Sequence, residues 1–376
     1  MTNKSYKILY VLGAGSYFLS HRLPTAEAAT TCGYQVQVMA IDDGVAQDIT
    51  DLGYLFHRRR WQHDTSPVLS TTLAIFQLMF LIFRTSPKIV HCISLKSAPI
   101  GLIAALFFWR IRFIFSINGL GYFFSRKDLA LFQSLMRMGI MFLFRHISKR
   151  RRFEVIFQNE DDKQIFKNNN IQNQTLFHLV RGSGVDVKKY VSDVYPFGPI
   201  VFGIGCRMLK IKGVDELIRA GLQLQEKNIP IKLLLAGSVD PGTPASLSVS
   251  YIKSCCRDGY IEWRGYVEDI KAFWEQCHVA VLPSHGGEGV PKSLLVAASM
   301  QRALIASDTN GNRDLIVEGV NGFLCEPRSV SSLEQAMLNC LSTDIRAFGA
   351  ASRRHILTQK MDNVSVTKAM IDIYKI

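Results

Sequence analysis

The stretch that decides the fold class runs from Ile8 to Ala40 and reads ILYVLGAGSYFLSHRLPTAEAATTCGYQVQVMA. The apolar run Ile8–Leu12 predicts a buried parallel strand, and Gly13-Ala-Gly15-Ser16 predicts a tight turn after it. A helix is expected over residues 20–32, followed by a second strand at Tyr34–Ala40. Strand, helix and parallel strand in this order form one β-α-β unit.

The same alternation continues along the chain and predicts a doubly wound α/β fold. Further strands are expected at Ile89–Ile93, Phe113–Ile117, Val155–Gln158, Ile200–Gly205, Lys232–Ala236, Ile261–Arg264, Val279–Leu282, Leu304–Ala306 and Gly322–Leu324. A turn-rich segment and a short linker near Pro196–Pro199 separate two lobes, which would face each other across a cleft. We therefore expect one domain over residues 1–190, a second over 191–360, and a final helix at 361–376 that crosses back to the first domain.

Composition narrows the class of protein. The chain has 376 residues, 48% hydrophobic and 20% charged, which excludes a disordered, collagen-like or small disulfide-rich protein. The net charge is +13, and it is uneven: residues 1–190 hold 24 basic and 12 acidic residues, whereas residues 191–376 hold 20 and 19. The first half should therefore meet an anionic partner.

The eight cysteines show no C-x-x-C pair and no zinc-ligand spacing, so we expect reduced thiols in a cytoplasmic protein without a metal. The N-terminus lacks the apolar region and cleavage site of a signal peptide. The longest apolar runs, Leu73–Phe83 and Ala98–Trp109, fall short of the roughly 18 residues that suggest a spanning helix. Any membrane contact is therefore expected to be peripheral.

The strongest chemical motif is the segment LPSHGGEGVPKSLL at residues 282–295, which reads as a strand end, a Gly-rich turn with one acid, and a helix start. Backbone amides of Gly289 and Val290 would lie at the helix N-terminus, where partial positive charge favours phosphate. Glu288 would stand beside them. The alternative is that Glu288 merely caps the helix and the glycines only form a turn.

Two cations follow the first strand of the second lobe. Arg207 and Lys212, which come after Gly205, can both face a diphosphate that lies across the strand ends. The alternative is a pair of solvated surface cations. In the first lobe Gly13, Gly15 and Ser16 could let the backbone approach the same diphosphate, although the pattern alone favours a plain tight turn until the other lobe supports the diphosphate.

These pieces together resemble the family 4 (GT-B fold) retaining glycosyltransferases, over nearly the whole chain and in the family's order. The resemblance is greatest to the bacterial branch that builds O-antigen, capsule or lipid-linked oligosaccharides. It is carried by Phe18–Pro24, His91 with Leu95-Lys96, Ser116–Gly121, Gln158–Asp162, Gly182–Asp186, Arg207 with Lys212, Gly237-Ser238, Glu262–Gly265, Leu282–Leu295 and Gly319–Phe323.

The resemblance implies two Rossmann-like domains of the GT-B fold, with a nucleotide sugar bound mainly by the second lobe. Arg207 and Lys212 would neutralise the diphosphate, and Glu288 would bond hydroxyls of the donor sugar. The donor is expected to be a UDP-sugar, and transfer would retain the anomeric configuration without a metal or other cofactor. Residues implied for donor binding are Gly13, Gly15, Ser16, Gly205, Gly289, Val290, Pro291 and Val296; those implied for the acceptor are Asn118, Gly119, His91 and Lys96.

Two positions depart from the family pattern. The second acid, seven residues after the first, is replaced by Val296, which cannot accept hydrogen bonds from hydroxyls. Asn118 stands where many relatives carry His. A catalytically impaired scaffold that binds a glycolipid or a partner glycosyltransferase therefore stays open, as does a GT-B sugar-nucleotide epimerase.

A basic and apolar stretch in the first lobe suggests a membrane surface. Residues 129–144 are mostly apolar and contain Arg137; Arg145, Lys149, Arg150, Arg151 and Arg152 follow. Apolar insertion together with attraction to anionic lipid would place the first lobe on the inner face of the cell membrane. The alternative is a buried helix followed by a solvated loop. A nucleic-acid partner is not expected, because no binding module is present.

Overall fold

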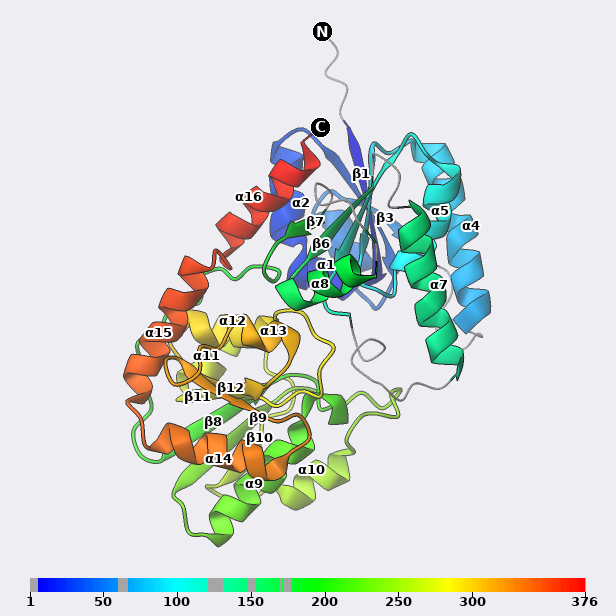
Figure 1. The fold of residues 1–376 in the computed structure, drawn as a ribbon. Helices are drawn as coiled ribbons and strands as arrows, with labels where there is room; N and C mark the ends of the chain where they lie inside the picture. The colour runs from blue at the N-terminus through cyan, green and yellow to red at the C-terminus, as the bar shows by residue number, and fades with distance from the viewer. Residues whose placement is uncertain are drawn as a thin grey trace. The chain divides into compact units, whose positions relative to one another are not determined.

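The computed structural model of the chain describes residues 6–59, 67–120, 131–147, 153–169, 171 and 177–375 (Figure 1). The chain forms two compact units. Unit 1 comprises Met1–Ser183 and Val364–Ile376, and unit 2 comprises Gly184–Asn363. Each is an α/β unit built on one sheet, and each is described by itself below.

The sheet of unit 1 has seven parallel strands in the order β3-β2-β1-β4-β5-β6-β7. The order reverses direction between β1 and β4, which creates the topological switch point of a doubly wound sheet. The strands are β1 Lys7–Ala14, β2 Gln35–Ile41, β3 Leu55–Arg58, β4 Ile89–Ile93, β5 Arg112–Ile117, β6 Phe153–Phe157 and β7 Phe177–Leu179.

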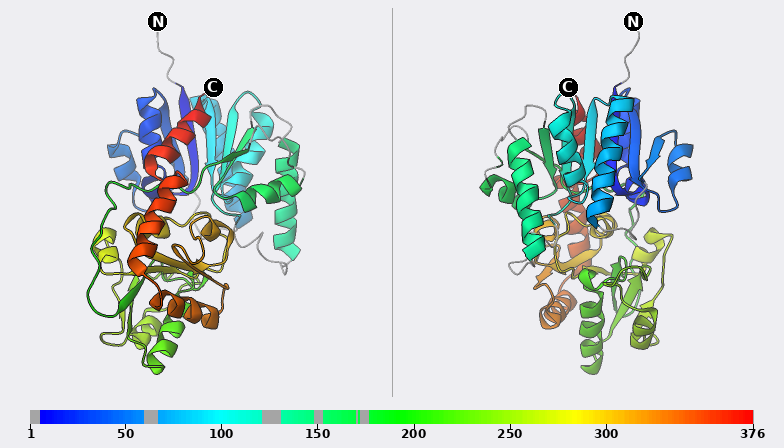
Figure 2. Two further views of the ribbon diagram at one scale, coloured as in Figure 1. Left: turned by 60° about the vertical axis from the view of Figure 1, so that its left-hand side comes forward. Right: turned by 90° about the vertical axis from the view of Figure 1, so that its right-hand side faces the viewer.

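Helices cover both faces of this sheet (Figures 1 and 2). Apolar residues of α4, α5, α7 and α8 form one core with the sheet, and those of α1, α2, α3 and α16 form another on the opposite face. These helices are α1 Gly15–His21, α2 Leu23–Thr31, α3 Ala46–Asp51, α4 Pro67–Thr85, α5 Ala98–Phe107, α7 Leu131–Ile147, α8 Glu160–Asn168 and α16 Asn363–Tyr374. The final helix of the chain is therefore part of unit 1.

The predicted single helix over residues 20–32 is wrong: the structure has two helices, and Arg22 forms the joint between them. Pro24 sits in the first turn of α2, has no N–H to donate to the preceding turn, and its ring clashes with a continuing helix. The break leaves the Arg22 backbone outside the helical region, at φ −124°. This joint follows α1, the seven-residue helix that leaves the carboxyl end of β1.

The sheet of unit 2 has six parallel strands in the order β10-β9-β8-β11-β12-β13. They are β8 Ile200–Gly205, β9 Ile231–Ala236, β10 Ile261–Trp263, β11 Val279–Leu282, β12 Ala303–Ser307 and β13 Gly322–Cys325. The helices are the 3-10 turn η2 Lys210–Lys212, α9 Val214–Glu226, α10 Val249–Cys255, α11 Ile270–Glu275, α12 Lys292–Ser299, α13 Asn310–Arg313, α14 Val330–Leu341 and α15 Ile345–Thr358.

The strands predicted from apolar runs are present, whereas two edge strands, β3 and β7, were not predicted. Both are short and only partly buried, so their sequences lack the apolar run that marks an interior strand. Among the described helices, none combines the length and hydropathy that a membrane span requires.

Candidate functional site

In unit 2, two loops at the carboxyl ends of the central strands β8 and β11 are fastened together. Gly213, which separates η2 from α9, has a left-handed φ of +74°, and a Cβ there would lie 2.0 Å from the Pro283 carbonyl oxygen. The His285 amide donates to the Ile211 carbonyl at 2.9 Å. Only glycine permits this approach, and it brings the Gly-rich loop beside Lys212.

Lys212 and Glu288 form an ion pair across these two loops, with the ammonium nitrogen 2.5 Å from Oε1. The side chains are 23% and 22% exposed, so the pair is partly shielded from water but reachable by a ligand. The alternative that Glu288 caps the following helix is wrong, because α12 has Pro291 at its N-cap and no side-chain cap.

Arg207 lies on the same edge of the sheet and is more open, with 64% of its side chain exposed. Its guanidinium donates to Asp240 at 3.2 Å, and Asp240 also accepts from the Thr243 hydroxyl at 2.8 Å. Gly237 holds the Asp240 loop in place, since a Cβ there would lie 1.7 Å from the Cys206 carbonyl oxygen. Each cation of the site therefore has its own carboxylate.

The thiol of Cys206 is buried at the end of β8, next to Arg207 in the chain. Burial raises the pKa of Cys206 to about 12, while the charges of Lys212 and Arg207 lower it and that of Glu288 raises it. Of the three residues predicted to be catalytic, the structure brings Lys212 and Glu288 into contact, and Arg207 is paired with Asp240 on the same edge of the sheet. A catalytic role for the three residues stays a prediction.

A second pair of side chains, His285 and Glu216, connects the Gly-rich loop to α9. The His285 ring lies 2.8 Å from Glu216 of α9. Burial raises the pKa of Glu216, but the hydrogen bond from His285, a backbone hydrogen bond and the charges of His285 and Arg219 together outweigh it, and the pKa falls below the usual value. His285 thus positions the loop that carries Glu288, a role that the sequence did not reveal.

Four of the residues predicted for donor binding lie on the Gly-rich loop or on α12, which follows it. Gly289 precedes the N-cap of α12 by two residues, and its carbonyl oxygen would lie 1.9 Å from a Cβ on Gly311. Val290 and Pro291 are buried, as is Val296, which is 5% exposed within the apolar core of unit 2. Gly205 ends β8 and packs against Trp274. A donor role for these residues stays a prediction.

In unit 1 the turn Gly13–Ser16 forms the end of β1 and the start of α1. Ser16 is bonded to Asp43, with its amide 3.0 Å from Oδ1. A Cβ on Gly15 would lie 2.8 Å from the Val45 side chain, so this glycine is explained by packing within unit 1. The backbone approach to a diphosphate predicted for these residues remains untested.

Of the predicted acceptor residues, Asn118, Gly119 and Lys96 lie after strands β5 and β4. Asn118 is partly exposed, Gly119 is buried with φ +109°, and Lys96 is exposed. Asn118 accepts a hydrogen bond from Arg22 at 3.0 Å, and its own amide donates to the Tyr17 hydroxyl at 2.6 Å.

His91, the fourth predicted acceptor residue, is fully buried, and this corrects the prediction of a cleft contact. One ring nitrogen is bonded to the Tyr374 hydroxyl at 2.8 Å and the other to the Ser116 hydroxyl at 2.7 Å. Burial, aided by the charge of Arg22, holds the pKa of His91 well below its usual value. His91 is therefore a neutral residue that packs α16 against the sheet.

Some of the residues predicted to contact a membrane lie within the part of the chain that the structure describes. Arg137 is half-buried on α7, and Arg145 is exposed at its end, where it donates to the Asn169 carbonyl at 3.0 Å. Lys149, Arg150, Arg151 and Arg152 lie outside the described residues.

Sequence reasoning nominated neither Arg22 nor Asp240, although both follow strands of their sheets. Asp240 could have been found from its position three residues after Gly237 at the end of β9. Arg22 could have been suspected because Pro24 forces a break in the helix there.

Comparison with known proteins adds to this geometry. Residues 7–159 match the family model described as "Glycosyl transferase 4-like", and residues 199–343 match "Glycosyl transferases group 1". The first lies within unit 1 and the second within unit 2.

Individual relatives are distant but cover most of the chain. An N,N'-diacetylbacillosaminyl-diphospho-undecaprenol alpha-1,3-N-acetylgalactosaminyltransferase of Campylobacter jejuni is 24% identical over 88% of each chain. The capsular polysaccharide biosynthesis glycosyltransferase CapM of Staphylococcus aureus is 23% identical over 69% of this chain and 68% of its own. The crystal structure of Anabaena HepE in complex with UDP superimposes with a TM-score of 0.75 at 16% identity, over 98% of this chain and 99% of that one.

Proposed function

Since the chain belongs to the family 4 glycosyltransferases and has their GT-B fold, we propose that it transfers a hexose or N-acetylhexosamine from a UDP-sugar to a lipid-linked saccharide, with retention of configuration. The observation that carries the proposal is the Lys212–Glu288 pair beside Arg207, at the carboxyl ends of the unit 2 strands. Surface glycan biosynthesis in bacteria is the proposed setting, because the Staphylococcus relative is by its name an enzyme of capsular polysaccharide biosynthesis and the Campylobacter relative acts by its name on a diphospho-undecaprenol-linked sugar.

The chemistry of the donor fits the charges of unit 2. A nucleotide diphosphate leaving group gains negative charge as the glycosidic bond breaks, and cations held in place beforehand stabilise that charge. Lys212 supplies a point charge and Arg207 a planar fork that can bind two phosphate oxygens at once. Glu288 accepts hydrogen bonds from sugar hydroxyls. Because Lys212 is already paired with Glu288, its position is fixed before the donor arrives.

A lipid-linked acceptor is the proposed substrate of unit 1. The Campylobacter relative acts, by its name, on a diphospho-undecaprenol, and it matches 88% of this chain. An acceptor of that class is anchored in a bilayer, so the enzyme must work at a membrane surface. We place this contact on unit 1, which carries the excess of positive charge.

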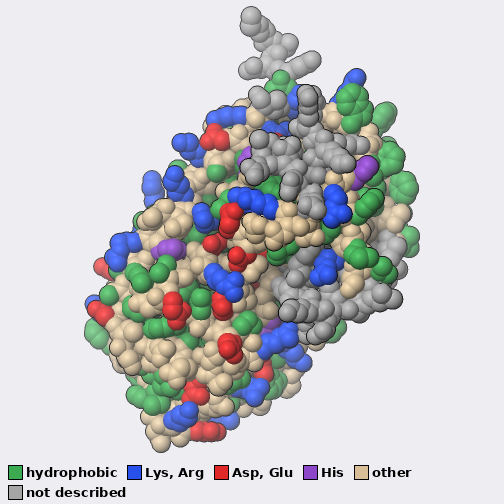
Figure 3. All heavy atoms as spheres, viewed as in Figure 1, with side chains coloured by type: hydrophobic (Ala, Val, Ile, Leu, Met, Phe, Trp, Pro, Cys, Tyr) green, Lys and Arg blue, Asp and Glu red, His purple; other side chains and the backbone are tan. Residues whose placement is uncertain are grey.

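The outer faces of α4, α5 and α7 support that placement. These helices lie side by side on one face of the unit 1 sheet (Figure 2, right), and hydrophobic side chains follow them along the right-hand side of Figure 3. On α4, Phe76, Phe80 and Phe83 are 64%, 64% and 79% exposed and recur at helical spacing. On α7, Met138 and Phe142 are 59% and 64% exposed. An apolar face of this kind fits partial insertion into a lipid interface.

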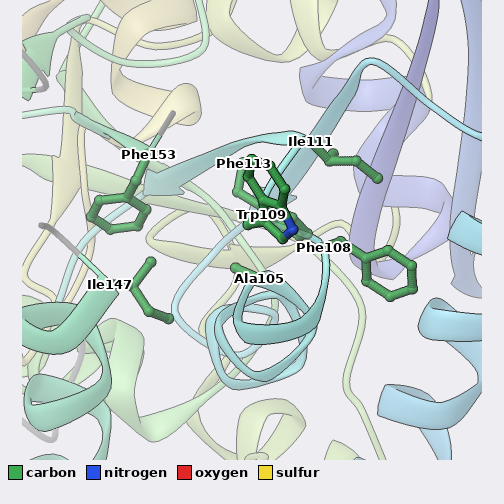
Figure 4. Close-up of a pocket in the computed structure, with 7 residues that line it drawn as sticks. All are labelled: Ala105, Phe108, Trp109, Ile111, Phe113, Ile147 and Phe153. Carbon is green, nitrogen blue, oxygen red and sulfur yellow. The ribbon is translucent and has the colours of Figure 1, made fainter. Parts of the chain in front are cut away.

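The same face has an interfacial anchor at the end of α5. Trp109 is 64% exposed and carries the Arg110 guanidinium 4.8 Å above its ring. Beside it lies a small pocket lined by apolar side chains alone (Figure 4). An amphipathic ring with a cation beside it suits the boundary between lipid headgroups and tails. The pocket is lined by Ala105, Phe108, Trp109, Ile111, Phe113, Ile147 and Phe153.

The experiment that tests the function is a donor panel with a polyprenyl diphosphate-linked saccharide as acceptor, read as nucleotide release and product mass. The wild type should turn over with at least one UDP-sugar, and Glu288→Gln should lose most of that turnover. Glu262→Gln is the matched control, because Glu262 pairs with Lys232 in the same unit at similar exposure. Binding of UDP without any turnover would instead favour the scaffold alternative that Val296 raises, and product formed without acceptor would favour an epimerase.

A membrane contact has its own test. Vesicles of anionic and of neutral lipid are sedimented with the wild type and with a variant carrying Phe76→Ser, Phe80→Ser and Phe83→Ser. Loss of about 0.8 kcal/mol per buried methylene group predicts a drop in partitioning of at least tenfold. Equal partitioning of the two proteins would remove the basis for this contact.

A further inference from the structure

Arg22 is a buried cation that has no carboxylate partner within the part of the chain that the structure describes. Its residue is 2% exposed, and Nη2 donates to the Asn118 side-chain oxygen at 3.0 Å. The Nε–H is buried and has no hydrogen-bond partner. Among the described residues, no Asp or Glu forms an ion pair with Arg22. Burying a charge without a counter-ion is costly, so a protein that keeps one there has a use for it.

The groups around Arg22 are neutral. Its charge acts on the ring of His91 and on the phenols of Tyr10, Tyr17 and Tyr374, none of which carries a charge near neutral pH. The carboxylate of Asp162, on α8, accepts hydrogen bonds from the Leu120 amide and from the Asn159 side chain. The positive charge of Arg22 is therefore not cancelled from within this cluster.

The directions of the hydrogen bonds made by Asn118 leave a second hydrogen-bond donor beside Arg22. The Asn118 oxygen accepts from Arg22 and, at 3.3 Å, from Gln158, which fixes the orientation of the Asn118 amide. Its nitrogen must then donate to the Tyr17 oxygen at 2.6 Å. The Tyr17 hydroxyl already accepts, so its own proton is available to a ligand. Tyr17 and Asn118 are both partly exposed, and the cluster opens to solvent at these two residues.

The location of the cluster fits a ligand site. Asn118 follows β5 and Gln158 follows β6, and Arg22, which follows α1, is bonded to Asn118, so all three lie at the carboxyl edge of the sheet. Ligands of open α/β sheets bind at that edge. The buried Arg302 of unit 2 is a useful contrast: its Nε–H also lacks a partner, but both of its Nη atoms donate to carbonyl oxygens, of Cys277 and Val194, and its guanidinium stacks on Tyr195.

We propose that Arg22 and Tyr17, held by Asn118, bind a phosphate oxygen of the lipid-linked acceptor, so that unit 1 recognises the acceptor by its diphosphate. This inference rests on the proposed function, because it assigns the acceptor of that reaction a chemical class. A cation and a phenolic proton both donate to an anion, and a diphosphate has oxygens enough to meet both. The diphosphate of the donor nucleotide offers the same chemistry, and the experiment separates the two sources.

The test is calorimetric titration of the whole protein with two probes: geranyl diphosphate, which carries the diphosphate on a short prenyl chain, and UDP. Asn118→Asp is the decisive variant, since it supplies Arg22 with a carboxylate of the same shape, and the oxygen that replaces the amide nitrogen accepts the Tyr17 proton instead of donating to Tyr17. Asn168→Asp, which makes the same change on the exposed surface of α8, is the matched control. Arg22→Lys keeps the positive charge but loses the planar guanidinium, which can bind two phosphate oxygens at once.

Asn118→Asp should bind geranyl diphosphate at least about tenfold more weakly than the wild type, with unchanged affinity for UDP. Arg22→Lys should retain part of the affinity, and Asn168→Asp all of it. Thermal melting checks the fold, and Asn118→Asp should melt no lower than the wild type because it gains an ion pair. Unchanged geranyl diphosphate binding in a folded Asn118→Asp protein, or a loss confined to UDP, would overturn the proposal. Binding is read without turnover, so failure of the Glu288 assignment would not affect this result.

Discussion

Both units place a cation at the carboxyl edge of their sheets, but they treat its charge differently. In unit 2, Lys212 pairs with Glu288, and Arg207 pairs with Asp240. In unit 1, Arg22 donates to an amide oxygen, and no carboxylate among the described residues pairs with it. A paired cation is held in position and can exchange its partner for a ligand, whereas an unpaired one is a site that an anion completes. The difference suggests that unit 2 positions its ligand and that unit 1 attracts one.

The largest effect is expected on turnover, when the paired cation of unit 2 is removed. Lys212→Met removes the point charge that stabilises the leaving diphosphate and leaves Glu288 without its cation. Loss of one such group costs about 10²–10³ in kcat. The measurement is steady-state nucleotide release, with Lys232→Met as the control from the other ion pair of similar exposure. A variant that keeps a tenth or more of the wild-type kcat would contradict the assignment.

Gly213→Ala tests how the pair is held in place. The added Cβ would meet the Pro283 carbonyl oxygen and require a left-handed alanine, so the two loops must separate. We expect a loss of about 2–3 kcal/mol in unfolding free energy, measured by urea denaturation, together with reduced turnover. Gly259→Ala has the same left-handed backbone but nothing within 4 Å of the new Cβ, and it should cost less. Equal losses in the two variants would show that the close approach is unimportant.

Arg207→Ala should have a smaller effect, because this side chain is 64% exposed. Its charge supplements that of Lys212, which remains in the variant. A weakening of UDP binding by about tenfold is expected, with a flatter dependence of affinity on salt. Titrations at low and high salt provide the measurement. If the salt dependence is the same as in the wild type, Arg207 does not meet the phosphates.

The smallest expected effect concerns the paired arginine of unit 1, Arg112, which lies against Glu154 and donates to carbonyl oxygens of α16. Burial raises the pKa of Glu154, but hydrogen bonds from His178 and Arg112 lower it more, and the net value is below normal. The contribution of Glu154 to the free energy of unfolding is therefore fully present above the pKa of the unfolded state, near 4.5. This contribution is lost as the pH falls through the lower pKa of the folded state. Melting temperatures from pH 6 to 3 should fall less steeply in Glu154→Gln than in the wild type, and parallel curves would refute this.

The sequence predicted the fold well where the strands are interior, because runs such as Val279–Leu282 are buried on both faces and leave a clear apolar signal. It also nominated Lys212 and Glu288, whose motif joins a strand end to a helix start. It could not reveal that His285 and Gly213 lock the two loops together, since those contacts join residues about 70 apart. Arg22 was missed for a related reason. Whether a cation has a partner depends on the tertiary fold, and His91 shows the converse, a polar residue that the fold buries completely.

The most direct test titrates UDP into Lys212→Met and Asn118→Asp side by side with the wild type. Our account predicts that the first change weakens UDP binding by about tenfold or more and that the second leaves it unaltered. Wild-type affinity in folded Lys212→Met protein would contradict the claim that the ion pair of unit 2 belongs to the nucleotide-sugar site.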